Sequence, residues 1–356
     1  ATMDAKMETH PLRRDLDIQL NLNEKLNRRI NSLKGKEKGL AYRDIKKGWK
    51  EIRRIENQIR DDILDKIQVV CCTCIGAGNE ILDGRRFPQV LIDEATQATE
   101  PASLVPLTRG ARQVVLVGDH KQLPPTVISF RAEEKGLKRS LFERLVDLGI
   151  EPLLLSTQYR MHPAISKFPN QHFYSDKLDD GIKSENRPAP AGLIWPDWEN
   201  PVAFVPVEGG EVVSPDGTSR ENPSEVSWVI KILNDILEAG EITKKDIGII
   251  TPYAGQVRAI RNSMNEKLDD VEVKTVDGYQ GREKEVIIFS CVRSNPEQNV
   301  GFLSEKRRLN VALTRAKRGL IVIGDPATLR GDDNWRAWLE YVRDRKFEAW
   351  HLLGMN

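Results

Sequence analysis

The sequence has no long hydrophobic run. None of its apolar stretches approaches the roughly 20 residues that a membrane-spanning helix needs, so no membrane partner is expected. The first residues also lack the basic-then-apolar pattern of a secretory signal, and we therefore expect a cytoplasmic location, with the nucleus as a second setting.

An excess of one charge is missing as well, since 54 Lys and Arg residues stand against 53 Asp and Glu residues. This balance neither predicts nor excludes binding to nucleic acid, which depends on how the charges are distributed.

Cysteine is scarce. The chain has four cysteines, and no clustered Cys and His pairs at the spacing of a zinc site accompany them. Cys71, Cys72 and Cys74 lie in one apolar run that predicts a buried strand, and Cys291 lies in another. Metal ligation is one interpretation of these thiols, and small apolar filling of a core is the other. The missing ligand pairs favour the second, so we expect reduced, structural cysteines.

What is present is the composition of a globular protein long enough for two domains, with 39% hydrophobic and 30% charged residues among 356. Up to about residue 66, apolar residues recur every three or four positions. This predicts two antiparallel helices separated by a break around Gly35 and Gly39. Lys and Arg dominate the polar faces, where a solvated surface without a binding role is the plainer interpretation. The apolar faces comprise Leu20, Leu22, Leu26, Ile30 and Leu33, then Ile45, Trp49, Ile52, Ile55, Ile59 and Ile63.

Beyond Ile67 the chain changes to short apolar runs, rich in β-branched residues and separated by helical segments. This pattern predicts parallel sheets covered by helices on both faces, and therefore the α/β fold class. One set of runs precedes about residue 155 and one follows it, with a loop-rich, irregular or β insertion at about 180–222. The expected strands lie within residues 68–74, 89–95, 113–119, 246–253, 285–292 and 319–325.

Two adjacent carboxylates follow one expected strand, in the segment VLIDEATQ. Neighbouring side chains on an extended segment point in different directions, so one of the carboxylates Asp93 and Glu94 can hold Mg²⁺ while the other addresses a water molecule. An acidic residue after an apolar strand is the Walker B arrangement of phosphoryl-transfer enzymes. A helix cap is the alternative, because such pairs also occur in that role.

Polar residues at other segment ends suit phosphate chemistry. Gln122 follows the run VVLVGD, where a glutamine can sense a γ-phosphate or orient the attacking water. In QYRMHP, Arg160 offers a guanidinium that stays charged and grips phosphate oxygens, and Tyr159 offers a flat ring for stacking. Glu283 lies in the glycine-containing block VDGYQGREKE, and Arg315 is expected on a helix that runs directly into a strand. Taken singly, an arginine of this kind is more typical of a salt-bridged surface.

Together, these blocks and their order resemble the superfamily 1B helicases of the up-frameshift kind, the regulators of nonsense transcripts in nonsense-mediated mRNA decay. The sequence is also similar to the senataxin and immunoglobulin-mu-binding helicases, but CCTCIGAG, ATQATEP and GREKEVIIFSCVR favour the first family. The resemblance extends from about Val69 to beyond Asp325. It is carried by VVCCTCIGAG, LIDEATQATEP, VGDHKQLPPTV, SLFERL, QYRMHP, IGIITPY, VDGYQGREKE, SCVRSN and RRLNVALTRAKRGL.

The resemblance implies tandem RecA-like parallel-sheet domains, the first of them incomplete, with an N-terminal helical stalk. Residues 1–66 would form the stalk, and residues 67–152 the C-terminal part of the first RecA-like domain. Residues 153–345 would form the second, with the insertion at about 180–222, and residues 346–356 a C-terminal tail.

The resemblance also implies an ATP-dependent RNA helicase, in which ATP hydrolysis between the two domains drives 5′-to-3′ translocation. Asp93 would coordinate Mg²⁺, and Glu94 would activate the hydrolytic water. Gln122 would couple the γ-phosphate to motion, while Arg160 and Arg315 would reach that phosphate from the second domain. Alternating closure and opening would then move single-stranded nucleic acid through sequence-tolerant backbone contacts.

Further contacts follow from the same resemblance. Tyr159 would stack on adenine, Gly281 and Glu283 would line the nucleotide cleft, and Thr251 and Thr275 would contact the nucleic-acid backbone. Single-stranded RNA is the favoured partner, although backbone contacts alone do not distinguish it from DNA. Protein partners in mRNA decay would bind through regions outside this chain.

One family feature is missing, the Gly-rich loop ending in Gly-Lys-Ser or Gly-Lys-Thr that holds the β- and γ-phosphates of ATP. The segment GKEKG at residues 35–39 has neither the spacing nor a preceding strand. We favour the hypothesis that the chain is part of a longer protein, because the remaining blocks are intact. On this hypothesis the chain alone has negligible ATPase activity. The alternative is a helicase-like nucleic-acid-binding module that never hydrolyses ATP.

Overall fold

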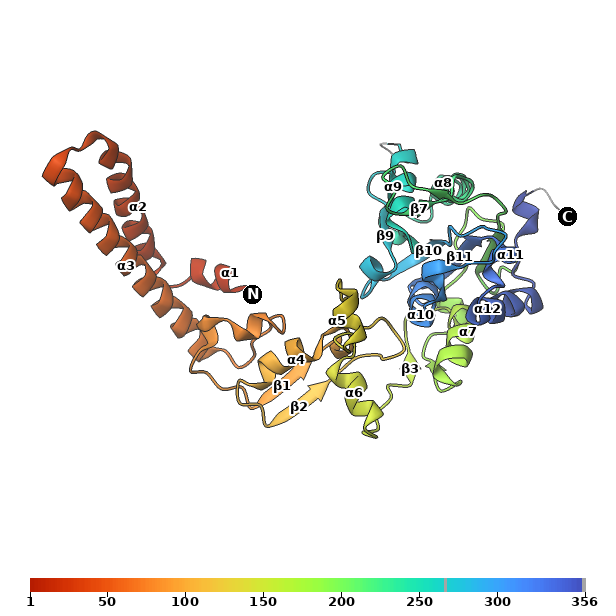
Figure 1. Cartoon of the computed structure of the whole chain (residues 1–356), viewed down its shortest axis with the longest axis horizontal. Coiled ribbons are helices and arrows are strands. Elements are labelled where there is room, and N and C mark those ends of the chain that lie inside the picture. The colour runs from red at the N-terminus through yellow and green to blue at the C-terminus, as the bar shows by residue number, and fades with distance from the viewer. Residues whose placement is uncertain (266–267, 354–356) are drawn as a thin grey trace. The chain divides into compact units, whose positions relative to one another are not determined.

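The computed structural model describes residues 1–265 and 268–353 (Figure 1). They fall into two compact units: Ala1–Val90 with Leu104–Val114, and Leu91–Ser103 with Val115–Asn356. The expected domain boundary between residues 152 and 153 stays a prediction. None of the described helices combines the length and the low charge that crossing a bilayer requires.

The first unit is dominated by a helical hairpin of α2 (Arg13–Arg29) and α3 (Gly35–Lys66), preceded by the short helix α1 (Met3–Glu8). Both expected helices are therefore confirmed, while α1 was not expected. The predicted break is narrower than expected, because α3 starts at Gly35 and continues through Gly39. A glycine inside a helix costs only about 1 kcal/mol, which packing can offset.

The hairpin is held by an apolar seam between α2 and α3. The expected isoleucines are all buried in it, and the expected Leu20, Leu26 and Leu33 are partly buried against it, whereas Leu22 and Trp49 are half-exposed. Met7, Leu16 and Ala41 are buried as well and were not expected. The seam of the hairpin and of α1 consists of Met7, Leu16, Ile52, Ile55, Ile59 and Ile63, with a second cluster of Ile30, Ala41 and Ile45 near the turn.

A two-stranded sheet, β1 (Gln89–Ile92) and β2 (Gln113–Leu116), follows the hairpin. The prediction of a sheet covered on both faces is wrong here, because Leu91 and Val115 are 66% and 53% exposed. Residues 68–74 form no strand at all, since no strand of the described chain pairs with them. Cys71 and Cys72 in this segment are exposed, so core filling is wrong for them.

The second unit is built on a five-stranded parallel sheet in the order β5-β11-β10-β8-β9. Alternate residues of its strands face two separate cores, as the pleat of a strand requires. In β10, for example, Ile287 and Phe289 enter one core, whereas Val286 and Ile288 enter the other. The strands are β5 (Val202–Pro206), β8 (Ile247–Thr251), β9 (Glu272–Thr275), β10 (Lys284–Ser290) and β11 (Ala316–Gly324).

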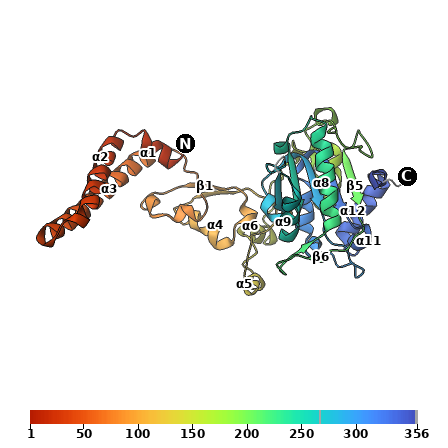
Figure 2. The same cartoon turned by 90° about the horizontal axis from the view of Figure 1, so that it is seen from above.

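Helices cover both faces of this sheet, which confirms the α/β class. One core is closed by α7 (Pro163–Tyr174), α10 (Lys306–Leu313), α11 (Pro326–Leu329) and α12 (Asp333–Asp344). The other is closed by α8 (Pro223–Glu238) and α9 (Ala254–Ser263). Figure 1 shows α8 and α9 on the opposite side of the strands from α12, and Figure 2 shows α8 and α9 from above.

The segment at 180–222 is more than an irregular insertion, because it contributes β5, a fully buried edge strand paired with β11. The polypeptide after α12 returns to β5, where Phe347 and Ala349 are buried and bonded to the Phe204 backbone. Smaller elements are α4 (Glu100–Leu107), α5 (Phe130–Glu134), α6 (Leu141–Asp147), β3 (Thr157–Gln158), β4 (Asp179–Asp180), β6 (Val212–Val213) and β7 (Arg220–Glu221).

Candidate functional site

The two adjacent carboxylates lie in a tight turn directly after β1. Both Asp93 and Glu94 are exposed, and Glu94 has a left-handed backbone (φ 50°, ψ 40°), which is uncommon for a residue other than glycine. The Glu94 N–H donates to Asp93 Oδ1 (3.0 Å), and Gln97 Nε2 donates to Glu94 Oε2 (2.6 Å). Each carboxylate thus keeps one oxygen free of hydrogen bonds from the described residues, and the two groups can serve different purposes.

Gln122 is held in a turn organised by Asp119. The Gln122 amide donates to Asp119 Oδ2 (2.9 Å), and the Tyr174 hydroxyl donates to the same oxygen (2.6 Å). Burial and the neighbouring Asp119 carboxylate raise the pKa of Tyr174, so its hydroxyl keeps the proton that it donates. From α10, Asn310 Nδ2 donates to the Tyr174 hydroxyl (2.8 Å) and to the Lys121 carbonyl (2.9 Å).

Sequence reasoning missed Tyr174 and Asn310. Asn310 gave a signal, since it is an amide among the apolar residues of the RRLNVALTR block, and it is fully buried. A buried amide without partners is costly, so a hydrogen-bonding role was to be expected there. Tyr174 gave no comparable signal.

Arg315 reaches the Gln122 side chain. The sequence predicted Arg315 on a helix. Because α10 ends at Leu313, Arg315 instead lies between that helix and β11. It is 2% exposed, and its guanidinium donates to the Val311 carbonyl (3.0 Å), Thr314 Oγ1 (2.8 Å) and Gln122 Oε1 (3.1 Å). Burial, followed by the charge of Arg160, lowers its pKa to about 10, so it stays a cation at neutral pH.

Arg160 and Glu283 form the next part of the same arrangement. Arg160 Nε donates to the Glu283 carboxylate, and Arg160 Nη1 donates to the Thr314 carbonyl (3.1 Å). Lys317 Nζ lies 3.2 Å from the other Glu283 oxygen. Burial raises the pKa of Glu283, but the hydrogen bonds and charges of Arg160 and Lys317 outweigh it and hold the pKa below its ordinary value. Gln122, Arg315, Arg160 and Glu283 are therefore linked through one set of contacts.

Tyr159 and Gly281 lie next to this cluster in the sequence. Tyr159 is 67% exposed, as a ring that stacks on a ligand must be. Its edge packs on Gly181, where a Cβ would come within 2.3 Å of the ring. Gly281 has a φ of +74°, which suits glycine at the turn before Glu283.

The two threonines predicted to contact nucleic acid end adjacent strands. Thr251 and Thr275 are partners in the β8–β9 register. Thr275 is partly exposed, and its Oγ1 accepts from Gly278 N (3.3 Å). Thr251, however, is fully buried, and its Oγ1 has no hydrogen-bond partner among the described residues. In this conformation its hydroxyl is not available to a nucleic-acid strand.

A magnesium ion would have one protein ligand here. No group of three or more His, Cys, Asp or Glu residues within 1–265 and 268–353 is arranged to hold a metal. Mg²⁺ usually keeps several waters and binds through one or two carboxylates plus substrate phosphates. The free oxygen of Asp93 fits that mode.

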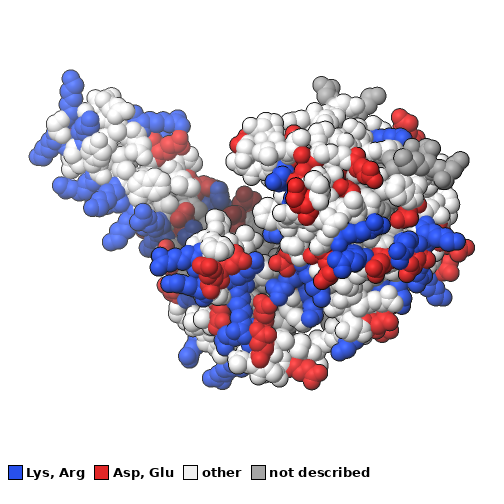
Figure 3. Space-filling view, turned by 45° about the vertical axis from the view of Figure 1, so that its right-hand side comes forward, with Lys and Arg blue, Asp and Glu red and all other residues white. Residues whose placement is uncertain are grey.

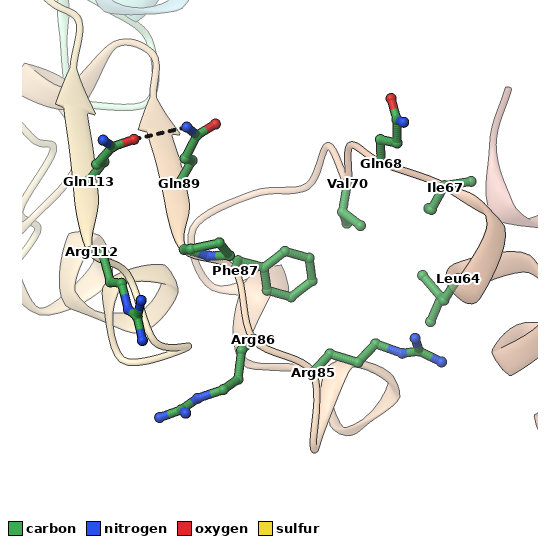
Figure 4. A pocket seen from close by; sticks show the side chains of 11 residues that line it. Leu64, Ile67, Gln68, Val70, Arg85, Arg86, Phe87, Gln89, Arg112 and Gln113 are labelled. Carbon is green, nitrogen blue, oxygen red and sulfur yellow. Dashed lines mark hydrogen bonds between the residues drawn. The ribbon is translucent and has the colours of Figure 1, made fainter.

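A cavity of about 600 Å³ opens in the first unit (Figure 4). Arg85, on its rim, is paired with Asp61 and Asp65 of α3. No residue predicted for the nucleotide or nucleic-acid site lines this cavity. Its lining consists of Leu64, Ile67, Gln68, Val70, Arg85, Arg86, Phe87, Pro88, Gln89, Arg112 and Gln113.

The carboxyl edge of the large sheet holds a buried acid that sequence reasoning also missed. The Glu225 carboxylate accepts from Ser290 Oγ (2.5 Å) and from Val292 N (2.9 Å to each oxygen). Val292 has a φ of +74°, a strained value for a β-branched residue. Burial raises the pKa of Glu225 from 4.5 to about 8. The sequence signal that could have drawn attention to Glu225 is the Asn222-x-x-Glu225 spacing, which is typical of a helix start. In the structure the Asn222 side chain accepts from Glu225 N.

Two family models match the chain. Both are described as an AAA domain, and they cover residues 3–130 and 137–327. The parallel sheet, the exposed acidic turn and the two neighbouring arginines are the features expected of a RecA-like domain of the helicase class. The chain belongs to the superfamily 1 helicase family of the regulators of nonsense transcripts.

Three relatives illustrate a similarity that extends over most of the chain. The Regulator of nonsense transcripts 1 homolog of Drosophila melanogaster is 44% identical, over 90% of this chain and 27% of the relative. The Neurospora crassa homolog is 46% identical, over 83% and 28%. The ATP-dependent helicase NAM7 of Saccharomyces cerevisiae is 45% identical, over 86% and 32%. The chain thus spans about a third or less of these relatives.

Among solved structures, the chain overlaps the PRRSV nsp10 helicase at 17% identity, over 68% of this chain and 38% of that one. The TM-score of 0.22 is too low for this overlap to bear on the fold or the function.

Proposed function

We propose that the chain forms the larger part of an ATP-driven motor that moves 5′ to 3′ on single-stranded RNA in nonsense-mediated mRNA decay. The observation that carries this proposal is the hydrogen bond between Arg315 and Gln122, with Arg160 and Glu283 beside it. Two arginines held next to a glutamine suit the transfer of a phosphoryl group, because the charge that develops in the transition state needs cations already in place.

The residues of the cluster would act in distinct ways. Glu94 would accept a proton from the attacking water, since one of its carboxylate oxygens is exposed and free. Arg315 and Arg160 would exchange their present acceptors, Gln122 and Glu283, for phosphate oxygens. Arg315 would then release Gln122. This release would transmit the presence of a γ-phosphate to the Asp119 turn and, through Tyr174, to α7.

Mg²⁺ and ATP enter this proposal through Asp93 and Tyr159. Asp93 would hold the Mg²⁺ ion, and the bound ion would neutralise part of the phosphate charge. Tyr159 would stack on the adenine. A cytoplasmic location, with the nucleus as a second setting, and decay-factor partners that bind outside this chain belong to the same proposal.

A helicase-like binding module without ATPase activity is the alternative function, because the sequence contains no Gly-x-x-x-x-Gly-Lys-Ser/Thr loop. We expect the 356-residue chain alone to release negligible phosphate from ATP. A longer form that includes such a loop should hydrolyse ATP and should be stimulated by single-stranded RNA. Phosphate release by both forms, with and without RNA, separates the two functions. Substantial turnover by the chain alone would contradict the need for the loop, and an inactive longer form would favour the binding module.

Glu94→Gln in the loop-containing form tests the proposed base. We expect nucleotide affinity to be retained and turnover to fall by about 10²–10⁴-fold, the range for loss of a general base. Gln97→Ala is the matched control, because it removes the residue that hydrogen-bonds Glu94 but leaves the carboxylate. Similar turnover in Glu94→Gln and the parent would show that another group accepts the proton.

A further inference from the structure

The exposed side of α3 segregates its charges. At about 100° per residue, positions spaced by seven fall in one row along a helix. Glu37, Asp44 and Glu51 form such a row on one flank of the exposed side. The opposite flank carries only basic and aromatic residues between positions 42 and 53. This surface, termed the α3 basic face, consists of Tyr42, Arg43, Lys46, Trp49, Lys50 and Arg53, all of them exposed.

The cations of the α3 basic face have no carboxylate to neutralise them. None of Arg43, Lys46, Lys50 and Arg53 forms an ion pair with another residue of the described chain, whereas Arg54, on the acidic flank, lies 2.7 Å from Glu51. Lys and Arg accordingly gather on the hairpin, at the upper left of Figure 3. An uncompensated row of this kind attracts a polyanion more strongly than a surface of mixed charge does.

Two aromatic rings lie within this row of cations. Tyr42 and Trp49 are 57% and 46% exposed, and seven residues place them about 10 Å apart along the helix. In the orientation that satisfies both ends of the buried Asn23 amide, its nitrogen donates to the Ile45 carbonyl (3.2 Å) and its oxygen accepts from Trp49 Nε1 (3.2 Å). One edge of the indole is thereby anchored to α2 while almost half of the side chain stays open, which reduces the entropy lost when a ligand stacks on it.

We propose that the α3 basic face binds single-stranded nucleic acid, with its cations on the phosphates and Tyr42 and Trp49 stacked on bases. Cations interleaved with aromatic rings are the arrangement that holds single strands without sequence preference. An acidic protein surface would need the cations but not two open rings. The inference rests on the proposed function, because it adds a second contact with the strand on which the motor would move.

The test measures binding of the 356-residue chain to a fluorescent oligo(U) of about 15 nucleotides, without nucleotide, across a series of salt concentrations. Lys46→Ala/Lys50→Ala/Arg53→Ala removes three cations of the α3 basic face. Arg28→Ala/Lys47→Ala/Arg54→Ala is the matched control, since it removes three cations of the same hairpin that each have a carboxylate partner. Trp49→Ala and Trp49→Phe test the ring.

We expect the first triple variant to bind at least tenfold more weakly, and its plot of log K against log salt to lose about two units of slope. Trp49→Ala should weaken binding roughly tenfold, with Trp49→Phe close to the parent. The proposal is overturned if the control loses as much affinity, if Trp49→Ala has no effect, or if the parent chain does not bind. An acidic peptide that binds the same residues with no dependence on Trp49 would indicate a protein partner instead. Because no ATP is present, each result leaves the proposed ATPase chemistry to its own tests.

Discussion

Most residues of the five-stranded sheet are buried, whereas β1 and β2 of the smaller sheet are largely exposed. Val322 in β11 is fully buried, but Val115 in β2 is 53% exposed. Both strands come from similar apolar, β-branched runs, GLIVIG in β11 and QVVL in β2. The larger sheet owes its burial to the helices on its two faces, because a run of this kind fixes strand formation but not what covers it.

The two sheets also differ in how they present charged groups. After β1, Asp93 and Glu94 are exposed and each keeps a free oxygen. Around the larger sheet, Arg315 and Glu225 are buried and satisfied by several hydrogen bonds. The exposed carboxylates can meet a ligand without rearrangement. The buried arginine must first give up the bond to Gln122.

The largest expected effect concerns that buried arginine. In the loop-containing form, we expect Arg315→Ala to lower ATP turnover by about 10³-fold or more with little change in nucleotide affinity, because its charge would act on the transition state. Steady-state phosphate release and nucleotide binding measure the two quantities. Arg318→Ala is the control, since this arginine follows shortly after Arg315 but pairs with Glu241. A loss of nucleotide affinity without a loss of turnover would mean that Arg315 contacts the bound nucleotide in the ground state rather than stabilising the transition state.

The three central strands of the larger sheet, β8, β10 and β11, were predictable from the sequence because their apolar, β-branched runs alternate with helical segments. Both edge strands escaped prediction, since β5 lies among the prolines and glycines of residues 180–222 and β9 has the largely polar sequence EVKT. The segment at 68–74 failed in the opposite way. Its composition favours a strand, but a strand also needs a hydrogen-bonding neighbour, which a local pattern does not contain.

The candidate site shows the same division. Glu94, Gln122 and Arg315 were recognisable by their residue types and by the blocks around them. Tyr174, which ties the Asp119 turn to Asn310, was not, because its role arises from a contact between positions 55 residues apart. Local patterns thus indicate the groups that we propose to meet a ligand, but not the groups that hold them in place.

A second, smaller effect is a pH dependence of the free energy of unfolding that comes from the buried Glu225. Its folded pKa of about 8 lies above its ordinary 4.5, so the folded state keeps a proton that the unfolded state loses between these values. Stability should therefore fall as the pH rises from about 5 to 8, by a few kcal/mol at most, and level off above that. Urea unfolding of the parent and Glu225→Gln at several pH values measures this difference. Parallel pH profiles would mean that Glu225 is ionised in the folded protein.

The smallest expected effect tests the contrast between the sheets directly, with the same substitution in each. Val322→Ala should lower the free energy of unfolding by about 2–3 kcal/mol, because it removes two buried methyl groups and leaves a cavity. Val115→Ala should cost about 0.5 kcal/mol or less, since its side chain is half in water already. Urea unfolding at one pH compares the two variants with the parent. If Val115→Ala costs as much as Val322→Ala, then β2 is covered in solution by another copy of the chain, and the loss should diminish on dilution.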